Sequence, residues 1–249
     1  MIIVKKDSEI EYMRFAGIIV RDTLLKLEES IKPGITTAEL DRIADEYIIK
    51  CGGKPSFKGY YGFPASICTS INDEVVHGIP SIKRHLNEGD ILSVDCGAIL
   101  NGYHGDAART FGVGRISSEA QKLIDVTRES FFKGIEYAKV NNRLTDISSA
   151  IQKYVESHSF SVVRDYVGHG IGRAMHEDPE VPNYGKPGRG PKLTHGMVLA
   201  IEPMVNIGDY SVIVEANDWT VITEDGSLSA HYENTVAILN DGPEILTLN

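Results

Sequence analysis

The sequence has few cysteines, no long apolar run and a shortage of basic side chains. Its three cysteines, Cys51, Cys68 and Cys96, include no Cys-x-x-Cys pair, which excludes a disulfide scaffold and a thiolate zinc knuckle and suits a reducing cytoplasm. No segment approaches the ~18 apolar residues of a membrane span, and the N-terminus becomes charged too early for a secretory signal. With 25 lysines and arginines against 35 aspartates and glutamates, the net charge of −10 argues against a dedicated nucleic-acid binder. We therefore expect a cytoplasmic protein with no membrane contact and no specific nucleic-acid partner.

The apolar pattern predicts two helices at the start of the chain, whose 249 residues are 42% apolar and can build a core. The first helix would have Asp7 or Ser8 as its cap. Its apolar stripe comprises Ile10, Met13, Gly17, Val20, Leu24 and Leu27. Thr36, with Glu39 three residues later, predicts a capping box for a second helix that ends at the Gly-Gly pair 52–53.

The second half repeats this order. Helices are expected from Ser117 and from Thr145, and residues 178–192, with four prolines and three glycines, indicate an ordered surface loop. Strand-like segments follow at 197–205, 210–215, 219–223 and 231–239. Helices followed by strands, twice, predict one α/β domain over residues 1–249 whose two halves, about 1–115 and 116–249, share a core.

A hairpin between the two runs 91–100 and 103–112 provides the first geometric prediction. The runs flank an Asn-Gly pair, which is the best short hairpin signal. In the register of a two-residue turn, Asp106 faces Gly97, and Asp95 is its diagonal neighbour on the same face. Diagonal side chains lie roughly 7–8 Å apart, which suits two carboxylates reaching toward ions ~3.5–4 Å apart. Gly97 would leave the space beside Asp106 open.

Several acids stand where burial is expected. Asp95 and Glu202 each follow four residues of a mostly apolar strand-like run, and a buried carboxylate costs several kcal/mol unless something satisfies it. The same question arises for Asp106, His169 and Glu233. Two bare aspartates side by side would repel, and one would stay protonated. A pair of divalent ions removes this difficulty, and four carboxylates with one imidazole suit Mn, Fe, Co or Zn.

Each of these residues also has an ordinary structural interpretation. Asp106 could cap a turn, and Glu233 could be a solvated strand residue. His77, His169 and His176, taken singly, are more often satisfied structural histidines than ligands. The glycines on either side of His169 favour function, because they let backbone and ligand approach closely.

Taken together, the motifs resemble those of a type I methionine aminopeptidase. They are Gly168-His169-Gly170-Ile171-Gly172, the Asp95/Asp106 pair, Ile201-Glu202-Pro203-Met204 and Glu233-Asn234-Thr235. The resemblance covers the whole chain and implies the pita-bread fold, an α/β architecture with two pseudo-twofold halves whose antiparallel sheet is covered by helices. It also implies a dinuclear metal centre. Asp95 would chelate one ion, Asp106 and Glu233 would bridge both, and His169 and Glu202 would complete the other.

The same resemblance implies an activity and roles for individual residues. The enzyme would remove the N-terminal methionine from nascent polypeptides when the second residue is small. Glu202 would move a proton, His176 would hydrogen-bond the scissile carbonyl oxygen, and His77 would contact the scissile amide nitrogen; both histidines would also touch substrate. The methionine pocket would be lined by Phe57, Tyr60, Phe63, Cys68, Met175 and Trp219, each of which could equally be core packing. Asn72 and Ser229 resemble a site for one monovalent cation.

Two other function classes stay open at this point. A prolidase-like peptidase shares the ligand set but usually carries an extra N-terminal domain, for which the sequence leaves no room before its first helix; it would prefer an Xaa-Pro peptide over Met-Ala-Ser. A binding or chaperone module on the same fold would lack ligands, whereas all five are present. Nascent-chain N-termini are the expected partners, a weak ribosome encounter is compatible with them, and a monomer is expected.

Overall fold

Helices and strands alternate in two blocks along residues 1–248, the part of the chain that the computed structural model describes. The helices are α1 (Asp7–Ser30), α2 (Thr37–Lys50), the short 3-10 helix η1 (Tyr60–Gly62), α3 (Ser118–Ile135) and α4 (Leu144–Ser157). The strands are β1 (Lys54–Pro55), β2 (Ile67–Ile71), β3 (Glu74–Val76), β4 (Ile91–Leu100), β5 (Tyr103–Gly112), β6 (Ser161–Val162), β7 (Gly168–Gly170), β8 (Glu177–Val181), β9 (Val198–Ile201), β10 (Met204–Asn206), β11 (Val212–Val214), β12 (Val221–Thr223), β13 (Ser229–His231), β14 (Asn234–Leu239) and β15 (Gly242–Ile245). The predicted α/β class with antiparallel sheets is confirmed. The internal repeat stays a prediction.

The N-cap of the first helix lies one residue before the predicted cap. Lys6 is the N-cap residue of α1, and its backbone N–H donates to the Glu9 carboxylate at 3.0 Å. Asp7 is therefore the first helical residue, where its negative charge favours the N-terminus of the helix dipole. The prediction of Asp7 or Ser8 as the cap was wrong because an acid within the first turn satisfies the helix end as well as an acid before it.

The other helix starts follow the sequence signals closely. The Thr36 hydroxyl accepts the backbone N–H of Glu39 at 3.1 Å, so Thr36 is confirmed as the cap of α2, but the Glu39 side chain makes no return bond to complete the predicted capping box. Ser117 caps α3 in the same way by accepting the N–H of Ala120 at 3.0 Å. Helix α4 starts at Leu144, one residue earlier than expected.

The β4–β5 hairpin has the predicted turn and register. Asn101 and Gly102 form the turn with φ values of 53° and 81°, the left-handed backbone that an Asn-Gly hairpin turn requires. Asp106 pairs with Gly97 across the strands, and Asp95 is two residues from Gly97 on the same strand. The two aspartates therefore lie diagonally on one face, as predicted.

Gly97 does not leave the predicted open space. A Cβ atom at this position would lie 2.8 Å from the Phe57 ring and 2.9 Å from Cβ of Ser56. The space beside Asp106 is instead filled by the Phe57 ring, which packs directly on the glycine backbone. The expectation of an empty gap was wrong because hairpin register cannot report what a distant segment places over the sheet.

The predicted strands 197–205 and 231–239 are each split in two. The first breaks at Glu202, followed by Pro203, which lacks the N–H that a continuing ladder needs. The second breaks at Glu233. Strands β9 and β14 pair in the same register as β10 and β13. The two breaks are therefore aligned, and Glu202 in one lies opposite Glu233 in the other.

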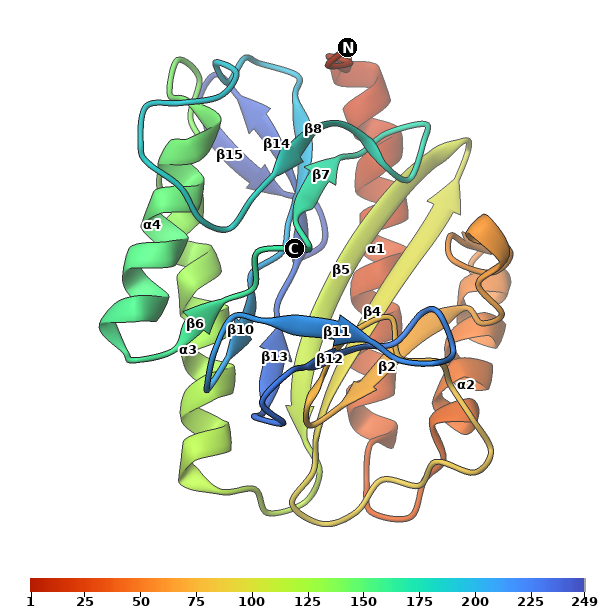
Figure 1. Cartoon of the computed structure of the whole chain (residues 1–249). Coiled ribbons are helices and arrows are strands. Elements are labelled where there is room, and N and C mark those ends of the chain that lie inside the picture. The colour runs from red at the N-terminus through yellow and green to blue at the C-terminus, as the bar shows by residue number, and fades with distance from the viewer. Residues whose placement is uncertain (249) are drawn as a thin grey trace.

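Two pairs of helices flank the strands (Figure 1). Helices α1 and α2 contact the β2–β4–β5 sheet, and α3 and α4 contact β13, β10 and β6 on the other side of the molecule. The five-stranded sheet has the order β15-β14-β9-β7-β8. Of residues 178–192, predicted as loop, the first four belong to strand β8, which pairs with β7. Within residues 1–248 no helix combines the length and apolarity that crossing a membrane would require.

Candidate functional site

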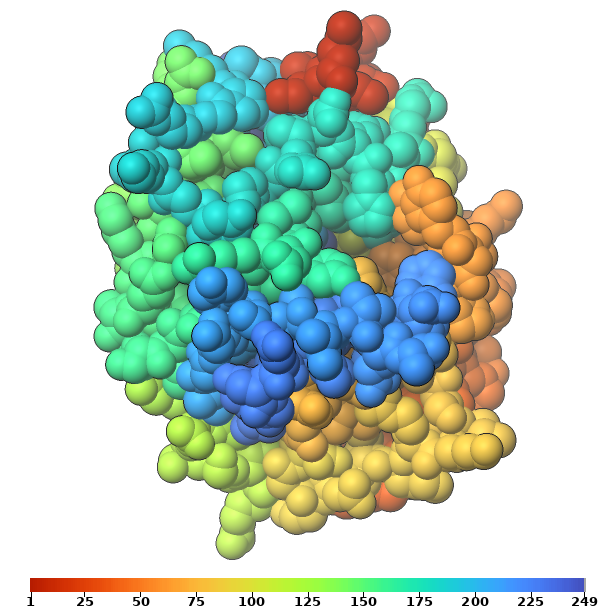
Figure 2. All heavy atoms as spheres, in the orientation of Figure 1, coloured from red at the N-terminus to blue at the C-terminus, as the bar shows by residue number. Residues whose placement is uncertain are grey.

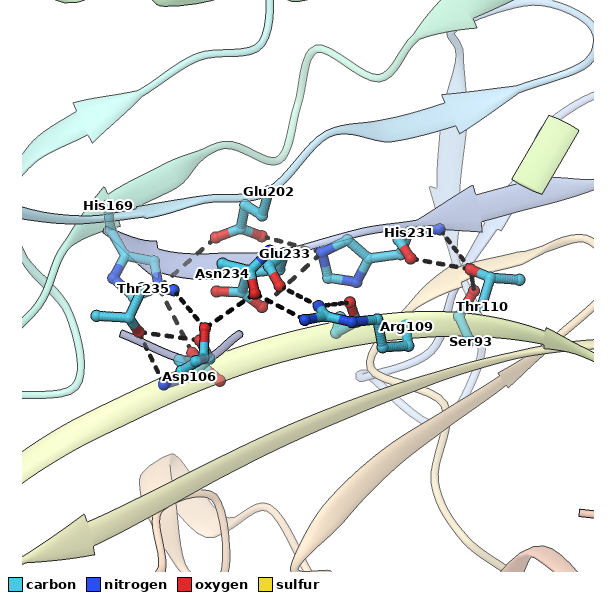
Figure 3. Close-up of polar contacts among 12 residues, drawn as sticks. Ser93, Asp106, Arg109, Thr110, His169, Glu202, His231, Glu233, Asn234 and Thr235 are labelled. Carbon is cyan, nitrogen blue, oxygen red and sulfur yellow. Dashed lines mark hydrogen bonds and ion pairs between the residues drawn. The ribbon is translucent and has the colours of Figure 1, made fainter. Parts of the chain in front are cut away.

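The five predicted metal ligands come from separate elements and line one cavity of about 240 Å³. Asp95 lies on β4, Asp106 on β5 and His169 on β7, while Glu202 and Glu233 occupy the two strand breaks. Figure 3 shows the side chains of Asp106, His169, Glu202 and Glu233 turned toward one another across the gap between β5 and the second half of the chain.

The spacing of these side chains is that of donors around a common point. Nε2 of His169 lies 3.6 Å from Oε1 of Glu202 and 3.9 Å from Oδ2 of Asp106. One ligand atom from each of Asp106, His169 and Glu233 lies within 4.8 Å of the other two. These separations are too long for hydrogen bonds and suit two atoms that each lie ~2.0–2.2 Å from a shared ion.

Burial makes the four carboxylates costly to ionise. It raises the pKa of Asp95 to about 7, and it raises the pKa of Asp106, Glu202 and Glu233 well above the usual range, with the neighbouring acids adding to the shift. Within residues 1–248 these carboxylates form no ion pair with a lysine or arginine. The only basic groups within 4.0 Å of Asp106, Glu202 and Glu233 are histidines. The cluster therefore lacks the positive charge that it needs near neutral pH.

Buried oxygens without partners identify what would supply that charge. Oδ1 of Asp95, Oδ1 of Asp106 and Oε1 of Glu233 are buried and accept no hydrogen bond from the described residues. A buried polar atom without a partner is uncommon in a folded protein. Carboxylate oxygens with an imidazole nitrogen are the donor set of divalent transition-metal ions, so the residues present fit a metal centre.

Side chains around the cluster hold its backbone in place. Arg109 donates to the carbonyl oxygen of Glu233 at 2.6 Å and to Oδ1 of Asn234 at 2.7 Å. The Thr235 hydroxyl accepts the N–H of Asp106 and donates to its carbonyl oxygen, both at 2.9 Å. Strand β5 is thus fastened to the second strand break. Sequence reasoning gave Arg109 no role, because its contacts to the second break are with groups more than a hundred residues away.

His231 is a further residue that the sequence analysis missed. Its Nε2 lies 3.7 Å from Oε2 of Glu202 and 4.0 Å from Oε2 of Glu233, and burial lowers its pKa to about 3. A signal for it was present, because alternate residues of a strand share a face and His231 precedes Glu233 by two.

An aromatic and apolar pocket adjoins the carboxylates. All of the predicted substrate-binding residues line the same cavity, together with Tyr61, which was not predicted; they are Phe57, Tyr60, Phe63, Cys68, His77, Met175, His176 and Trp219. Figure 2 shows the surface hollowed between its orange, teal and blue segments. The rings of Phe63 and Trp219 meet edge to face at 5.1 Å. Burial and the Asp95 charge raise the pKa of the Cys68 thiol, which stays neutral.

Two histidines stand between the pocket and the carboxylates. Nδ1 of His176 lies 2.8 Å from the Tyr60 hydroxyl, and its ring lies 4.2 Å from that of His169. His77 has a left-handed φ of 60°, a conformation that costs a non-glycine residue energy and tends to occur at functional sites. Burial lowers the pKa of His77 to about 4, so its imidazole is neutral near pH 7.

Asn72 and Ser229, predicted near a monovalent cation, lie side by side. The Ser229 N–H donates to the Asn72 carbonyl oxygen at 2.8 Å. The Asn72 side chain is occupied by Asp90 and by the N–H of Ile91, and the Ser229 hydroxyl donates to the Val205 carbonyl. Any cation at this place would depend on backbone oxygens, and the site stays a prediction.

Comparisons with known proteins agree with this geometry. The model of metallopeptidase family M24 matches residues 11–240. The chain belongs to metallopeptidase family M24. A methionine aminopeptidase from Clostridium acetobutylicum is 73% identical over all of this chain and 99% of its own length. The crystal structure of a methionine aminopeptidase from Thermotoga maritima superposes with a TM-score of 0.98 at 48% identity, covering all of both chains.

These matches confirm the resemblance stated from the sequence. The chain is an M24 enzyme of the methionyl aminopeptidase class, it uses divalent metal, and it acts on peptides. A prolidase from Pyrococcus horikoshii has a TM-score of 0.80 at 24% identity, and this chain covers 63% of it. That likeness shows only a shared fold.

Proposed function

We propose that this M24 enzyme holds two divalent ions and removes the N-terminal methionine from polypeptides whose second residue is small. One observation carries the proposal. Five ligand side chains come from sequence positions up to 138 residues apart. They line one cavity together with apolar side chains that form a pocket for the methionine side chain.

The ligand assignment is the one that the family resemblance implies, and all five residues line the cavity. Asp95 would hold one ion, Asp106 and Glu233 would bridge both, and His169 and Glu202 would complete the second. When bound, such ions lower the pKa of a water molecule and polarise a peptide carbonyl. The two unpartnered aspartate oxygens support the assignment, since each needs a positive partner.

The protein's own groups handle protons and orientation. Glu202 is assigned by the resemblance as the proton carrier beside the reacting bond, and it lies 3.6 Å from His169 and 3.7 Å from His231. His176 donates a hydrogen bond to the scissile carbonyl oxygen as negative charge develops on it. The Tyr60 hydroxyl supports this role if it donates its hydrogen bond to Nδ1 of His176. The proton of the neutral imidazole then lies on Nε2, which is free to donate to the carbonyl oxygen. His77 contacts the scissile amide nitrogen.

The lining of the pocket supports methionine as the residue removed. Phe63, Met175 and Trp219 offer apolar and polarizable surface, and a neutral Cys68 thiol adds a soft contact for a thioether. We expect the second residue of the substrate to be small. A steric clash with a large second residue would cost more binding free energy than any contact in the methionine pocket could add.

The decisive experiment compares peptides and metals on the purified chain. Met-Ala-Ser should be cleaved after methionine, Met-Leu-Ser should be cleaved far more slowly, and an Xaa-Pro peptide whose first residue is not methionine should not be cleaved. Thorough chelation should abolish cleavage, and Mn²⁺, Fe²⁺, Co²⁺ or Zn²⁺ added singly should restore it. Cleavage that survives chelation would contradict the metal centre, and preference for Xaa-Pro would favour the prolidase-like alternative.

The cellular setting is part of the same proposal. Nascent-chain N-termini in the cytoplasm are the proposed substrates, with a monomeric enzyme and at most a weak encounter with the ribosome. A stoichiometry of two ions per chain, measured on an anaerobically handled sample that also turns over Met-Ala-Ser, would test the ion number and the activity together.

A further inference from the structure

His231 is a buried imidazole that points at the carboxylates without belonging to the five-ligand set. Its side chain is 2% exposed, and its Nε2 has no hydrogen-bond partner among the described residues. Figure 3 shows the ring approaching Glu202 and Glu233 from the side opposite His169. A polar atom buried in this way has a cost unless a partner satisfies it.

Glu202 lies between the two imidazoles and presents a different oxygen to each. Its Oε1 is 3.6 Å from Nε2 of His169, and its Oε2 is 3.7 Å from Nε2 of His231. One oxygen therefore faces the predicted ligand cluster, and the other faces His231. Whatever holds Oε2 also fixes the direction of Oε1, because the carboxylate is planar and rigid.

The chemistry of a neutral imidazole decides its orientation. It carries one N–H and one lone pair, and a lone pair directed at two carboxylates would be repelled. The proton therefore belongs on Nε2. The distances to Oε2 of Glu202 and of Glu233 exceed a direct hydrogen bond, but a single water molecule between them would accept from Nε2–H and donate to both acids.

We propose that His231 is a positioning residue for Glu202, holding its Oε2 by a hydrogen bond, direct or relayed by one water molecule, so that Oε1 stays turned toward the metal centre. This inference rests on the proposed metal centre. The alternative is that His231 is itself a metal ligand, because atoms of Glu202, His231 and Glu233 also lie within 4.8 Å of one another. An extra ion at that corner would be repelled at close range by the two already proposed.

Three substitutions separate these possibilities. His231→Gln keeps an N–H donor of similar reach, His231→Asn has the same amide but is too short, and His231→Leu fills the space without a donor. Co²⁺ titration of the metal-free chain by calorimetry should show affinity about 10–100-fold weaker in the Asn and Leu variants and close to wild type in the Gln variant. The Gln–Asn comparison still decides the matter if the Leu variant fails to fold.

The visible absorption of bound Co²⁺ and the kinetic constants complete the test. The Gln variant should keep the wild-type spectrum, and the Asn and Leu variants should lose kcat more than they raise KM. Equal loss in all three variants, with a changed spectrum in the Gln variant, would make His231 a ligand and overturn the proposal. Wild-type affinity in all three would make it a core residue only. A wild-type chain that binds no Co²⁺ would overturn the proposed function, and this inference with it.

Discussion

Glu202 and Glu233 face each other across a break that two antiparallel strands share. The pairs Ile201–Asn234 and Met204–His231 keep one register on either side of it. At the break the regular ladder is interrupted, although the Tyr232 N–H still donates to the Pro203 carbonyl oxygen at 3.2 Å, and the two carboxylates project into a gap. Strand β5 closes the gap from the other half of the chain, through mutual hydrogen bonds between the backbones of Ala108 and Glu233 at 3.0 and 3.3 Å.

The metal centre should make stability depend on pH. Unfolded carboxyl groups ionise near pH ~4, whereas folded Asp95 has a pKa of about 7. In the metal-free chain, Asp95 therefore destabilises the fold increasingly as the pH rises from ~4 to about 7. Mn²⁺ binds the ionised acids and should therefore raise Tm more at about pH 7.5 than at about pH 5.5. His169, with its pKa lowered to about 3, is neutral at both. Equal shifts in Tm at the two pH values would contradict this account.

His169→Ala should remove metal-dependent turnover while the fold persists. The imidazole is the nitrogen donor closest to both Asp106 and Glu202, and alanine supplies no donor. Steady-state kinetics with Met-Ala-Ser and circular dichroism of the same sample provide the check. His158→Ala, on the C-terminal end of α4, is the matched control and should keep wild-type kinetics. Normal turnover in the His169 variant would remove it from the ligand set.

His176→Ala should lower kcat by about 10²–10³ if its N–H stabilises developing negative charge on the carbonyl oxygen. Tyr60→Phe should cause a smaller loss, because it removes the 2.8 Å contact that orients the imidazole but keeps the imidazole itself. Both values come from Met-Ala-Ser kinetics at saturating substrate. An unchanged kcat in the alanine variant would assign His176 to packing.

Gly97→Ala should destabilise the fold by about 1–3 kcal/mol, because the new methyl group would overlap the Phe57 ring. Denaturant unfolding measures the change. Combining it with Phe57→Ala should cost less than the sum of the two single changes, since truncating the ring removes part of the overlap. Additive costs would show that the two residues do not press on each other.

The sequence alone determined what depends on neighbouring residues. The Thr36 and Ser117 caps are side chains bonding to the backbone three residues on, and the Asn101-Gly102 turn sets its own hairpin register. The diagonal placement of Asp95 and Asp106 therefore followed from local rules. The family of the chain followed from the order and spacing of the candidate ligands.

Only the tertiary structure decided how the separate segments meet. That Phe57 fills the space over Gly97, that Arg109 fastens the Glu233 backbone, and that His231 approaches Glu202 all depend on segments brought together from distant parts of the chain. The paired breaks at Glu202 and Glu233 are of the same kind, because apolar alternation reads identically through a strand and across its interruption. Local hydrogen bonds and turn angles are encoded residue by residue, whereas packing between halves depends on the whole buried surface at once.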